Sequence, residues 1–321
     1  MKRILTRRSW LAGSLASGCG RRRPGPAPAL VSILRAPEYD QRLYGELRRV
    51  ISEHRLDVRG KRILLKPNLV EFAPNRAIHT HPLVVHAALE AFRAAGAAEV
   101  RIAEGPGHRR DTLDLAEAAG YFQTIPGFEA LFQDLNLDEV SAVRLHRPHS
   151  ALDLLYLPHT VLRCDLLVSL PKMKTHHWVG ATLGMKNLFG VVPGGVYGWP
   201  KNLLHWAGIH ECIADLYGLF PRQFVIVDGI VAMEGNGPIQ GTPRRSGVIV
   251  AGSDPAAVDA TGCRLMQIDP RQIDYLRLAA GVQALDEARI RQIGEPIASA
   301  AQPFELLPEF RALRRKDDAQ L

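Results

Sequence analysis

Cysteine is scarce in this sequence, with four residues among 321, and the four stand far apart in the chain. They are Cys19, Cys164, Cys212 and Cys263, and none belongs to a C-x-x-C pair. This spacing excludes a zinc ribbon and a cysteine run that would hold an iron–sulfur cluster. An odd number of cysteines follows Cys19, which argues against a disulfide framework, so we expect these side chains to fill space in the core.

Long hydrophobic runs and internal repeats are also missing. Apolar residues make up 46% and charged residues 23% of the chain, which is ordinary globular usage and excludes a collagen or a disordered tail. The apolar stretch at 10–16 is too short for a membrane span, which needs about 20 residues. A chain of this length is expected to fold as one large domain or two small ones.

Acidic residues are absent from residues 1–23, and this absence accounts for the net charge of the whole chain. The chain has 40 Lys and Arg against 33 Asp and Glu, which gives a formal charge of +7. Residues 1–23 contain seven Lys and Arg, so subtracting them leaves residues 24–321 formally neutral. The basic character therefore does not indicate a nucleic-acid partner for the folded part, and we expect none.

The first 23 residues have the pattern of an export signal, with basic residues, a short apolar stretch and small residues after it. Thr6–Leu11 resembles a twin-arginine signal. Ala16–Cys19 resembles a bacterial lipoprotein cleavage box, although leucine is usual at its first position. We expect export to the periplasm or cell envelope; a lipid anchor at the cysteine and a plain disordered N-terminus both stay open. A Pro/Gly tether over 24–30 then leads to a single domain over 31–321.

From residue 29 onward, short apolar segments alternate with segments of helical periodicity. Thr80 is the expected N-cap of a helix that ends at Gly96. Strand, helix and strand over 62–103 form a βαβ unit, which implies a parallel pair of strands. The expected strands are 29–34, 62–65, 99–103, 165–170, 223–227 and 247–251, and the other expected helices are 41–54, 203–219, 255–266 and 271–285.

This alternation predicts the α/β fold class, with a mostly parallel sheet and helices on both of its faces. Residues 104–160 and 172–202 are less regular, so we expect these insertions to form a lid or a small subdomain. Ligands of such sheets bind beyond the carboxyl ends of the strands. The residues that follow the predicted strands are therefore the first candidates for a site.

Polar side chains follow most of the predicted strands, and a shared sheet edge would bring them into one cleft. Lysines, carboxylates and an asparagine occur there together, which is the mixture that binds and transforms small polar molecules. The candidates at these strand ends are Lys66, Asn68, Glu104, Lys172, Lys174, His176 and Asp228.

The segment 171–190 is the most unusual stretch, because Lys172, Lys174 and Lys186 occur among glycines and large apolar residues. Lysine charges and backbone N–H groups at glycine turns suit a phosphate or a carboxylate. A solvated basic loop is the alternative, but the interleaved apolar residues favour a segment that lines a ligand. A loop rich in Gly, Tyr and Trp follows at 194–199 and is typical of a mobile cover.

Two carboxylates have competing interpretations. Glu104 precedes Gly-Pro-Gly, a turn that would hold the carboxylate at the strand tip for catalysis, and the alternative is an ion pair with Lys66 or Arg62. Asp259 lies among apolar neighbours on a predicted helix, so it needs a partner, either a lysine or backbone N–H groups. A structural role and a catalytic role stay open for Asp259.

Histidines raise a metal as a further alternative. His79 and His81, and likewise His176 and His177, lie on expected loops where acidic residues could complete a site. Their spacing matches no zinc motif such as H-E-x-x-H. No metal or other cofactor is identified from the sequence, and a metal stays open.

A series of short motifs carries a family resemblance. The motifs are, in order, Lys66–Asn68, Thr80–Pro82, Glu104–Gly105, Leu170–His176, Gly184–Asn187, Asp228–Gly229, Glu234–Pro238 and Ser253–Asp259. Together they resemble the family called domain of unknown function 362, over residues 60–280. Some members of that family carry a ferredoxin-like four-cysteine run, which this chain lacks, so an iron–sulfur cofactor is not carried over. Exported members with a twin-arginine-like start resemble this chain.

These observations predict an exported enzyme that binds a small anionic substrate in a lysine-rich cleft at the carboxyl ends of the strands. One alternative is a non-catalytic lipoprotein that binds an anionic solute, and another is a metal or redox-cofactor protein. The expected catalytic residues are Glu104, Asp228 and Lys172. The expected ligand-binding residues are Lys66, Asn68, Lys174, His176, Lys186, Asn187 and Asp259.

Overall fold

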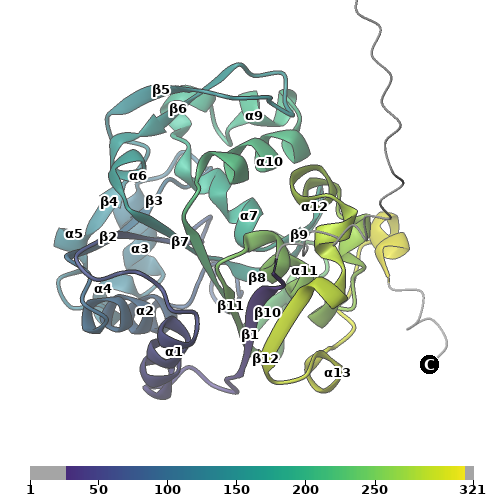
Figure 1. Ribbon diagram of the computed structural model, residues 1–321. Helices are drawn as coiled ribbons and strands as arrows, with labels where there is room; N and C mark the ends of the chain where they lie inside the picture. Colours follow the sequence, from purple (N-terminus) through teal and green to yellow (C-terminus); the bar gives the residue numbers. More distant parts are fainter. Residues whose placement is uncertain (1–26, 315–321) are drawn as a thin grey trace, which may run out of the picture.

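A 10-stranded sheet runs through the molecule, with helices packed on either side (Figure 1). The computed structural model describes residues 27–314, so the predicted export signal lies outside the described residues. The strands, in order across the sheet, are β12 (Ile290–Gly294), β1 (Ala29–Arg35), β11 (Thr242–Gly252), β10 (Gln223–Glu234), β7 (Leu166–Leu170), β2 (Arg62–Pro67), β3 (Glu99–Glu104) and β4 (Phe132–Asp134). Strand β8 (Lys172–His176) also pairs with β10 and with the short β9 (Gly180–Thr182).

Most neighbouring strands of this sheet are parallel, as the sequence predicts. Strand β2 pairs in parallel with both β3 and β7, and β10 pairs in parallel with β7 and β8. The exceptions are β11, which is antiparallel to both β1 and β10, and the short β9, which is antiparallel to β8. The fold class is therefore α/β with a mixed, mostly parallel sheet.

Two separate cores cover the two faces of the sheet, which confirms the prediction of helices on both faces. Along β10, Phe224 and Ile226 belong to one core while Val225 and Val227 belong to the other, because successive side chains of a strand point to opposite faces. The first core takes helices α1 (Arg42–Glu53), α2 (Pro82–Ala94), α3 (Thr112–Ala118), α4 (Tyr121–Thr124) and α5 (Phe128–Leu131). The second takes α7 (Gly184–Asn187), α10 (Ile209–Leu219), α11 (Pro255–Leu265) and α12 (Asp274–Ala280).

Side-chain caps begin the helices that flank the sheet edge. Asp254 caps α11 by accepting from the backbone N–H of Ala256 and Ala257, as the sequence predicts. The cap of α2 is His81 and not Thr80, because the His81 ring accepts from the Leu83 N–H. The Thr80 hydroxyl is buried and is used differently: it donates to the Leu170 carbonyl and accepts from the Asn68 N–H. Thr80 therefore joins two strand ends.

Several predicted elements differ in length from the observed ones. The helix expected over 203–219 is divided at Gly208, whose φ of 107° only glycine adopts readily, into α9 (Asn202–Trp206) and α10. The helix expected over 271–285 is α12 between two short 3₁₀ turns, η2 (Pro270–Gln272) and η3 (Val282–Leu285). Strands β10 and β11 are longer than predicted because they continue to pair with each other beyond a bulge at Gly229.

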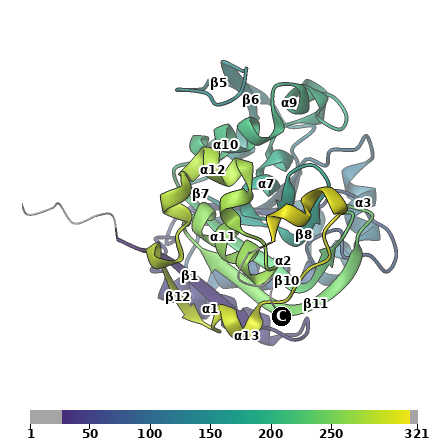
Figure 2. The same ribbon diagram turned by 90° about the vertical axis from the view of Figure 1, so that its right-hand side faces the viewer.

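The irregular insertions contain more structure than the sequence predicts. Strands β5 (Val140–Arg144) and β6 (Leu154–Pro158) form their own two-stranded sheet, next to α9 and apart from the main sheet (Figure 2). The expected loop after residue 171 is instead the fully buried strand β8, because it continues the line of β7 beside β10. The remaining elements are α6 (His159–Arg163), η1 (Leu188–Val191), α8 (Gly194–Tyr197), η4 (Glu287–Arg289), α13 (Ile297–Ala300) and η5 (Pro308–Leu313).

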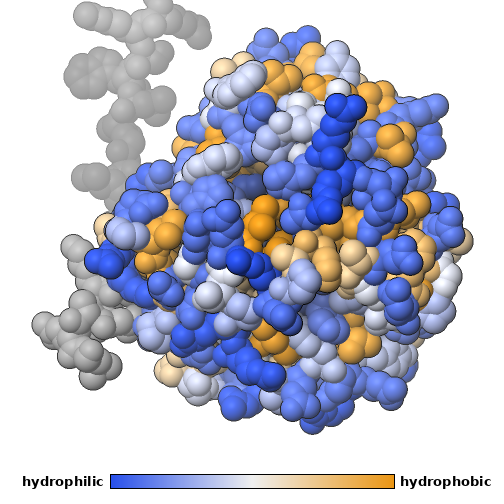
Figure 3. All heavy atoms as spheres, turned by 180° about the vertical axis from the view of Figure 1, so that it is seen from behind, coloured by the Kyte–Doolittle hydropathy of each residue, from blue (hydrophilic) through white to orange (hydrophobic). Residues whose placement is uncertain are grey.

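The surface and the cysteines agree with an ordinary globular core. On the face shown in Figure 3, hydrophobic residues occur in small separate groups among hydrophilic ones. Cys212 and Cys263 are buried in the core, Cys164 is half-buried, and all three are free thiols. Among residues 27–314 there is no helix with the length and apolar character needed to span a bilayer.

Candidate functional site

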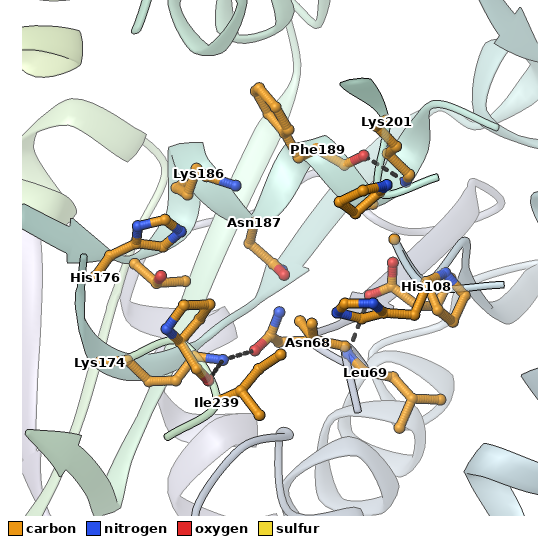
Figure 4. A pocket seen from close by; sticks show the side chains of 18 of the residues that line it. Asn68, Leu69, His108, Lys174, His176, Lys186, Asn187, Phe189, Lys201 and Ile239 are labelled. Carbon is orange, nitrogen blue, oxygen red and sulfur yellow. Dashed lines mark hydrogen bonds between the residues drawn. The ribbon is translucent and has the colours of Figure 1, made fainter. Parts of the chain in front are cut away.

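A cavity of about 200 Å³ lies where strands β2, β3 and β8 end, and the turn containing α7 and the segment up to His205 close its other sides. Figure 4 shows side chains from these elements converging on it. The sequence predicts that the polar residues at the strand ends share one cleft, and most of its ten candidates do. The candidates that line this cavity are Lys66, Asn68, Glu104, Lys174, His176, Lys186 and Asn187.

A buried ion pair between Lys66 and Glu104 forms one wall of the cavity. The two side chains are 1% and 3% exposed, so the pair is withdrawn from bulk water. The Lys66 ammonium also donates to Asn187 Oδ1 at 3.0 Å and to the Pro67 carbonyl at 2.7 Å. Glu104 accepts from the backbone N–H groups of Leu69 at 3.2 Å and of Gly105 at 3.0 Å. These contacts fix the orientation of both charged groups.

Gly190 makes room for this pair. A Cβ at position 190 would overlap Glu104 Oε1 and the end of the Lys66 side chain. Any larger residue there would have to displace the ion pair, so the glycine is required for close approach. The Gly190 carbonyl also accepts from the Gly105 N–H at 3.0 Å, which ties the end of β3 to the turn that follows α7.

Lys174 is surrounded by oxygen atoms of neutral groups. Its ammonium donates to Asn68 Oδ1 at 2.7 Å, to the Ile78 carbonyl at 2.7 Å and to the Pro238 carbonyl at 3.3 Å. Burial lowers the pKa of Lys174 well below its ordinary value, and the neighbouring lysines lower it further. Lys174 is therefore a basic group withdrawn from water. Among residues 27–314 it forms no ion pair with a carboxylate.

Lys186 is held differently, since its amine contacts the Phe189 ring at 4.0 Å from the centroid. Across the described part of the chain it has neither a hydrogen bond nor an ion pair. Burial, followed by the charge of Lys66, lowers the pKa of Lys186 to about 7. Figure 4 shows this amine directed into the space between Asn187 and Phe189.

Lys201 is a fourth lysine of the cavity and is not among the residues predicted from the sequence. It is 2% exposed and donates to the carbonyls of Gly105 at 2.6 Å and Phe189 at 2.7 Å. Burial lowers its pKa to about 7. Its left-handed backbone, with φ of 69°, points the side chain inward from a loop that looks solvated by its composition. The only signal in the sequence is a lysine within a Gly-, Trp- and Pro-rich segment.

Two histidines at the cavity have tautomers set by their neighbours, and His205 is likewise not among the residues predicted from the sequence. The Trp178 N–H donates to His176 Nδ1 at 3.0 Å, so the proton of His176 lies on Nε2. His205 Nδ1 lies 3.0 Å from the Lys201 carbonyl, which only accepts, so His205 carries its proton on Nδ1 and Nε2 is left as an acceptor. Burial lowers the pKa of both rings, which favours their neutral forms.

Lys172 and Asp228 lie outside this cavity, in a second buried cluster. The Lys172 ammonium is 2.5 Å from Asp228 Oδ2 and donates to the Tyr39 hydroxyl at 2.9 Å. Asp228 also accepts from the Tyr39 hydroxyl at 3.0 Å and from the His81 N–H at 2.9 Å. The Tyr39 ring stacks on His81 with centroids 3.7 Å apart. Asp228 is not at a strand end, because β10 continues to Glu234.

Asp259 also lies outside the cavity, where it holds the turn containing α7, one of the elements that line the cavity. Its carboxylate accepts from the backbone N–H of Gly184 at 2.7 Å and of Met185 at 2.9 Å, which confirms the expected pairing with backbone N–H groups. Burial raises the pKa of Asp259 to about 7, against the effect of these hydrogen bonds. Asp259 therefore holds the turn that carries Lys186 and Asn187.

Basic side chains outnumber acidic ones in the lining of the cavity. Four lysines line it, and within the described part of the chain Glu104 is the one carboxylate that does so. Residues 27–314 contain no cluster of three His, Cys, Asp or Glu that could hold a metal ion. A bound anion would compensate the unbalanced charge and raise the lowered lysine pKa values.

Comparison with known proteins places this chain in a family. The family model described as Domain of unknown function (DUF362) matches residues 63–264, a region that includes every lysine of the cavity. The chain belongs to this family. A DUF362 assignment agrees with the order of motifs found in the sequence.

Individual relatives of this DUF362 chain are distant. The thylakoid-associated protein sll1697 of Synechocystis is 32% identical over 220 residues, which are 67% of this chain and 65% of that protein. Among solved structures, a lactate racemase apoprotein from Thermoanaerobacterium thermosaccharolyticum has a TM-score of 0.46 at 14% identity, over 75% of this chain and 57% of that one. A Thermotoga maritima protein has a TM-score of 0.39 at 12% identity, over 70% and 58%. The match covers less than two thirds of each of these three proteins.

Proposed function

We propose that this DUF362 chain is an enzyme that binds a small anionic molecule in the lysine-lined cavity. The observation that carries the proposal is the charge balance there, four lysines against one carboxylate. The charged forms of these lysines are costly in the buried cavity, which is why their pKa values are low, and a bound anion would stabilise the charged forms. The size of the cavity, about 200 Å³, fits a small metabolite.

The residues divide into binding and reacting groups. Lys174 and Lys201 supply positive charge that would hold the anion, with Lys186 beside them. The Asn187 amide keeps Lys66 in place. Glu104 is the candidate general base, because its carboxylate lines the cavity and is oriented by Lys66 and two backbone N–H groups.

A non-catalytic protein that captures an anionic solute is the alternative. It uses the same lysines but has no need of Glu104 as a reacting group. Export from the cytoplasm, with or without a lipid anchor at Cys19, is compatible with either function and rests on residues outside the described range. The mass of the mature N-terminus tests it, since an unprocessed Met1 contradicts export.

The test compares Glu104→Gln with Glu99→Gln, a matched control at the exposed start of the same strand. Each protein is titrated with phosphate, oxalate and glycolate by calorimetry, and each is incubated with a metabolite extract whose anions are followed by mass spectrometry. An enzyme depletes one anion in the wild type and in Glu99→Gln but not in Glu104→Gln, while anion binding survives in all three.

The outcomes separate the candidate functions. Binding without depletion by the wild type favours the solute-binding protein, and depletion that survives in Glu104→Gln removes Glu104 from catalysis. If none of the three anions binds to the wild type at moderate ionic strength, the anion cavity itself is wrong.

A further inference from the structure

Lys186 differs from the other lysines of the cavity in its partners. Lys66, Lys174 and Lys201 each donate to at least two oxygen atoms. Lys186 contacts the face of Phe189 and, among residues 27–314, has no oxygen partner. Because no hydrogen bond to oxygen holds this amine, a ligand can engage it at the cost of the Phe189 contact alone.

The surroundings of Lys186 favour the neutral amine. Burial lowers the pKa of the amine, because it penalises the charged form. Basic groups on several elements lie around the amine, and Lys66 lowers its pKa further. Among the described residues, Glu104 is the one carboxylate that raises this pKa, and Glu104 is already paired with Lys66. The titratable groups around the amine are Lys66, Lys174, Lys201, His176, His205 and Glu104.

The local backbone holds the amine in place. Lys186 lies on the short helix α7, and Asp259 binds the first two N–H groups of that helix from the buried α11. The next residue, Asn187, is fixed by Lys66 and Ser169. The Lys186 amine is therefore carried by a rigid turn, which is the arrangement a nucleophile needs.

We propose that Lys186 is a nucleophile that forms a Schiff base with the carbonyl group of a small oxo acid bound in this cavity. The inference deepens the proposed function and rests on it, because neighbouring lysines must first bind the carboxylate of the oxo acid. Lysines in apolar or cation-rich pockets are activated for this chemistry. The Phe189 ring against the amine also shields one side of it from water, which would hydrolyse the product.

The step balances without an oxidant or a reductant. The nitrogen lone pair of neutral Lys186 attacks the carbonyl carbon, and the electron pair of the C=O bond moves to oxygen. The resulting carbinolamine loses that oxygen as water, and both hydrogens of the water come from the amine. The product is a C=N bond between the lysine and the oxo acid.

The experiment traps the imine in the wild-type protein with glyoxylate, a small aldehyde acid, and cyanoborohydride at neutral pH. Peptide mass spectrometry then measures the rate of carboxymethyl adduct formation at Lys186 and at Lys61, a partly exposed lysine that does not line the cavity and serves as an internal reference. A free amine is roughly half unprotonated at a pH equal to its pKa and under about 0.1% unprotonated three units below it. We therefore expect Lys186 to react at least about tenfold faster than Lys61.

Two further measurements link the reaction to the anion site. Glycolate has the carboxylate but no carbonyl, so it should slow labelling of Lys186 and leave Lys61 unchanged. Acetaldehyde has the carbonyl but no carboxylate, so its advantage at Lys186 over Lys61 should be smaller than that of glyoxylate, because only the larger neutral fraction of the amine then favours Lys186. In Lys186→Arg the fast adduct disappears, whereas Lys61→Arg keeps it.

Each result counts for or against the proposal. If calorimetry shows that glycolate binds but Lys186 reacts no faster than Lys61, Lys186 is not the nucleophile, and the proposed anion site is retained. If Lys186 reacts fast but glycolate does not slow the reaction, Lys186 is a nucleophile but its substrate is not an oxo acid bound through its carboxylate. If neither glycolate nor glyoxylate binds and no fast adduct forms, the anion site and the nucleophile both fail.

Discussion

Two buried lysine–carboxylate pairs lie along the same part of the sheet, and their surroundings differ. Lys66 and Glu104 come from the ends of the neighbouring strands β2 and β3 and face a cavity lined by further lysines. Lys172 and Asp228 come from β8 and β10, and Tyr39 covers them. All four charged side chains are nearly inaccessible to solvent.

The difference teaches how to separate a structural ion pair from one at a binding site. Around Asp228 every strong contact is made within the protein, by a lysine, a tyrosine hydroxyl and backbone N–H groups. Beside Glu104 the protein places more positive charge than the carboxylate can neutralise. A satisfied pair needs no ligand, whereas an unbalanced cluster gains stability from one.

The largest expected effect comes from Asp228→Ala. The substitution leaves the Lys172 ammonium buried without its counter-charge, and removing one partner of a buried pair costs about 3–5 kcal/mol. We expect the free energy of unfolding in urea to fall by that amount, while the protein that stays folded binds glycolate with unchanged affinity. Asp57→Ala, on the exposed surface, is the control and should change neither quantity. If Asp228→Ala lost affinity for glycolate without losing stability, the Lys172–Asp228 pair would belong to the anion site together with the Lys66–Glu104 pair.

A second prediction concerns pH. Burial lowers the pKa of Lys186 and Lys201 to about 7 in the folded protein. In the unfolded chain, the pKa of a lysine has its ordinary value of about 10.4. Above about pH 7 the unfolded state therefore binds more protons than the folded state, and the free energy of unfolding rises with pH. Each lysine contributes at most about 1.4 kcal/mol per pH unit. Urea unfolding in non-coordinating buffers between about pH 7 and pH 8.5 measures the slope.

Two variants test whether the rise of the unfolding free energy with pH comes from the lysines of the cavity. Lys186→Met removes one of the titrating groups and should flatten the slope, while Lys61→Met at the surface should leave it intact. Saturating glycolate should also flatten it, because a bound anion restores the charged form of the lysines. A slope that is equal in Lys186→Met and in the wild type would show that this amine titrates normally.

Much of the fold could be predicted because its signals are local. Short apolar runs with helices between them indicate a parallel sheet, and both β2 and β3 lie where the pattern places them. The errors arise where tertiary pairing overrides local pattern. Strand β10 passes through Gly229 because β11 pairs with it on both sides of the bulge, so Asp228 is inside a strand and not at its end.

The site could be predicted in part for the same reason. Lys66 and Glu104 follow apolar strands directly, and parallel strands bring their ends together. Lys201 and His205 could not be found this way. Lys201 directly precedes α9 and His205 lies on that helix. Lys201 points inward through contacts with Gly105 and Phe189, and no periodicity in the sequence encodes those contacts. The separation of Asp228 from Glu104 likewise depends on which side chains cover each pair.

The smallest expected effect comes from Tyr39→Phe, which opens the Lys172–Asp228 pair without removing a charge. The Tyr39 hydroxyl donates to Asp228, accepts from Lys172, and accepts from the Val231 N–H at 3.1 Å. Losing a hydrogen-bonded hydroxyl costs about 1 kcal/mol when the remaining partners keep each other satisfied. Tyr44→Phe, on the exposed face of α1, is the control. We expect urea unfolding to register the loss for Tyr39→Phe alone, and the rate of glyoxylate trapping at Lys186 to be the same in both variants. A slower trapping rate in Tyr39→Phe would mean that the covered pair also governs the cavity, and the contrast between the two pairs would then be wrong.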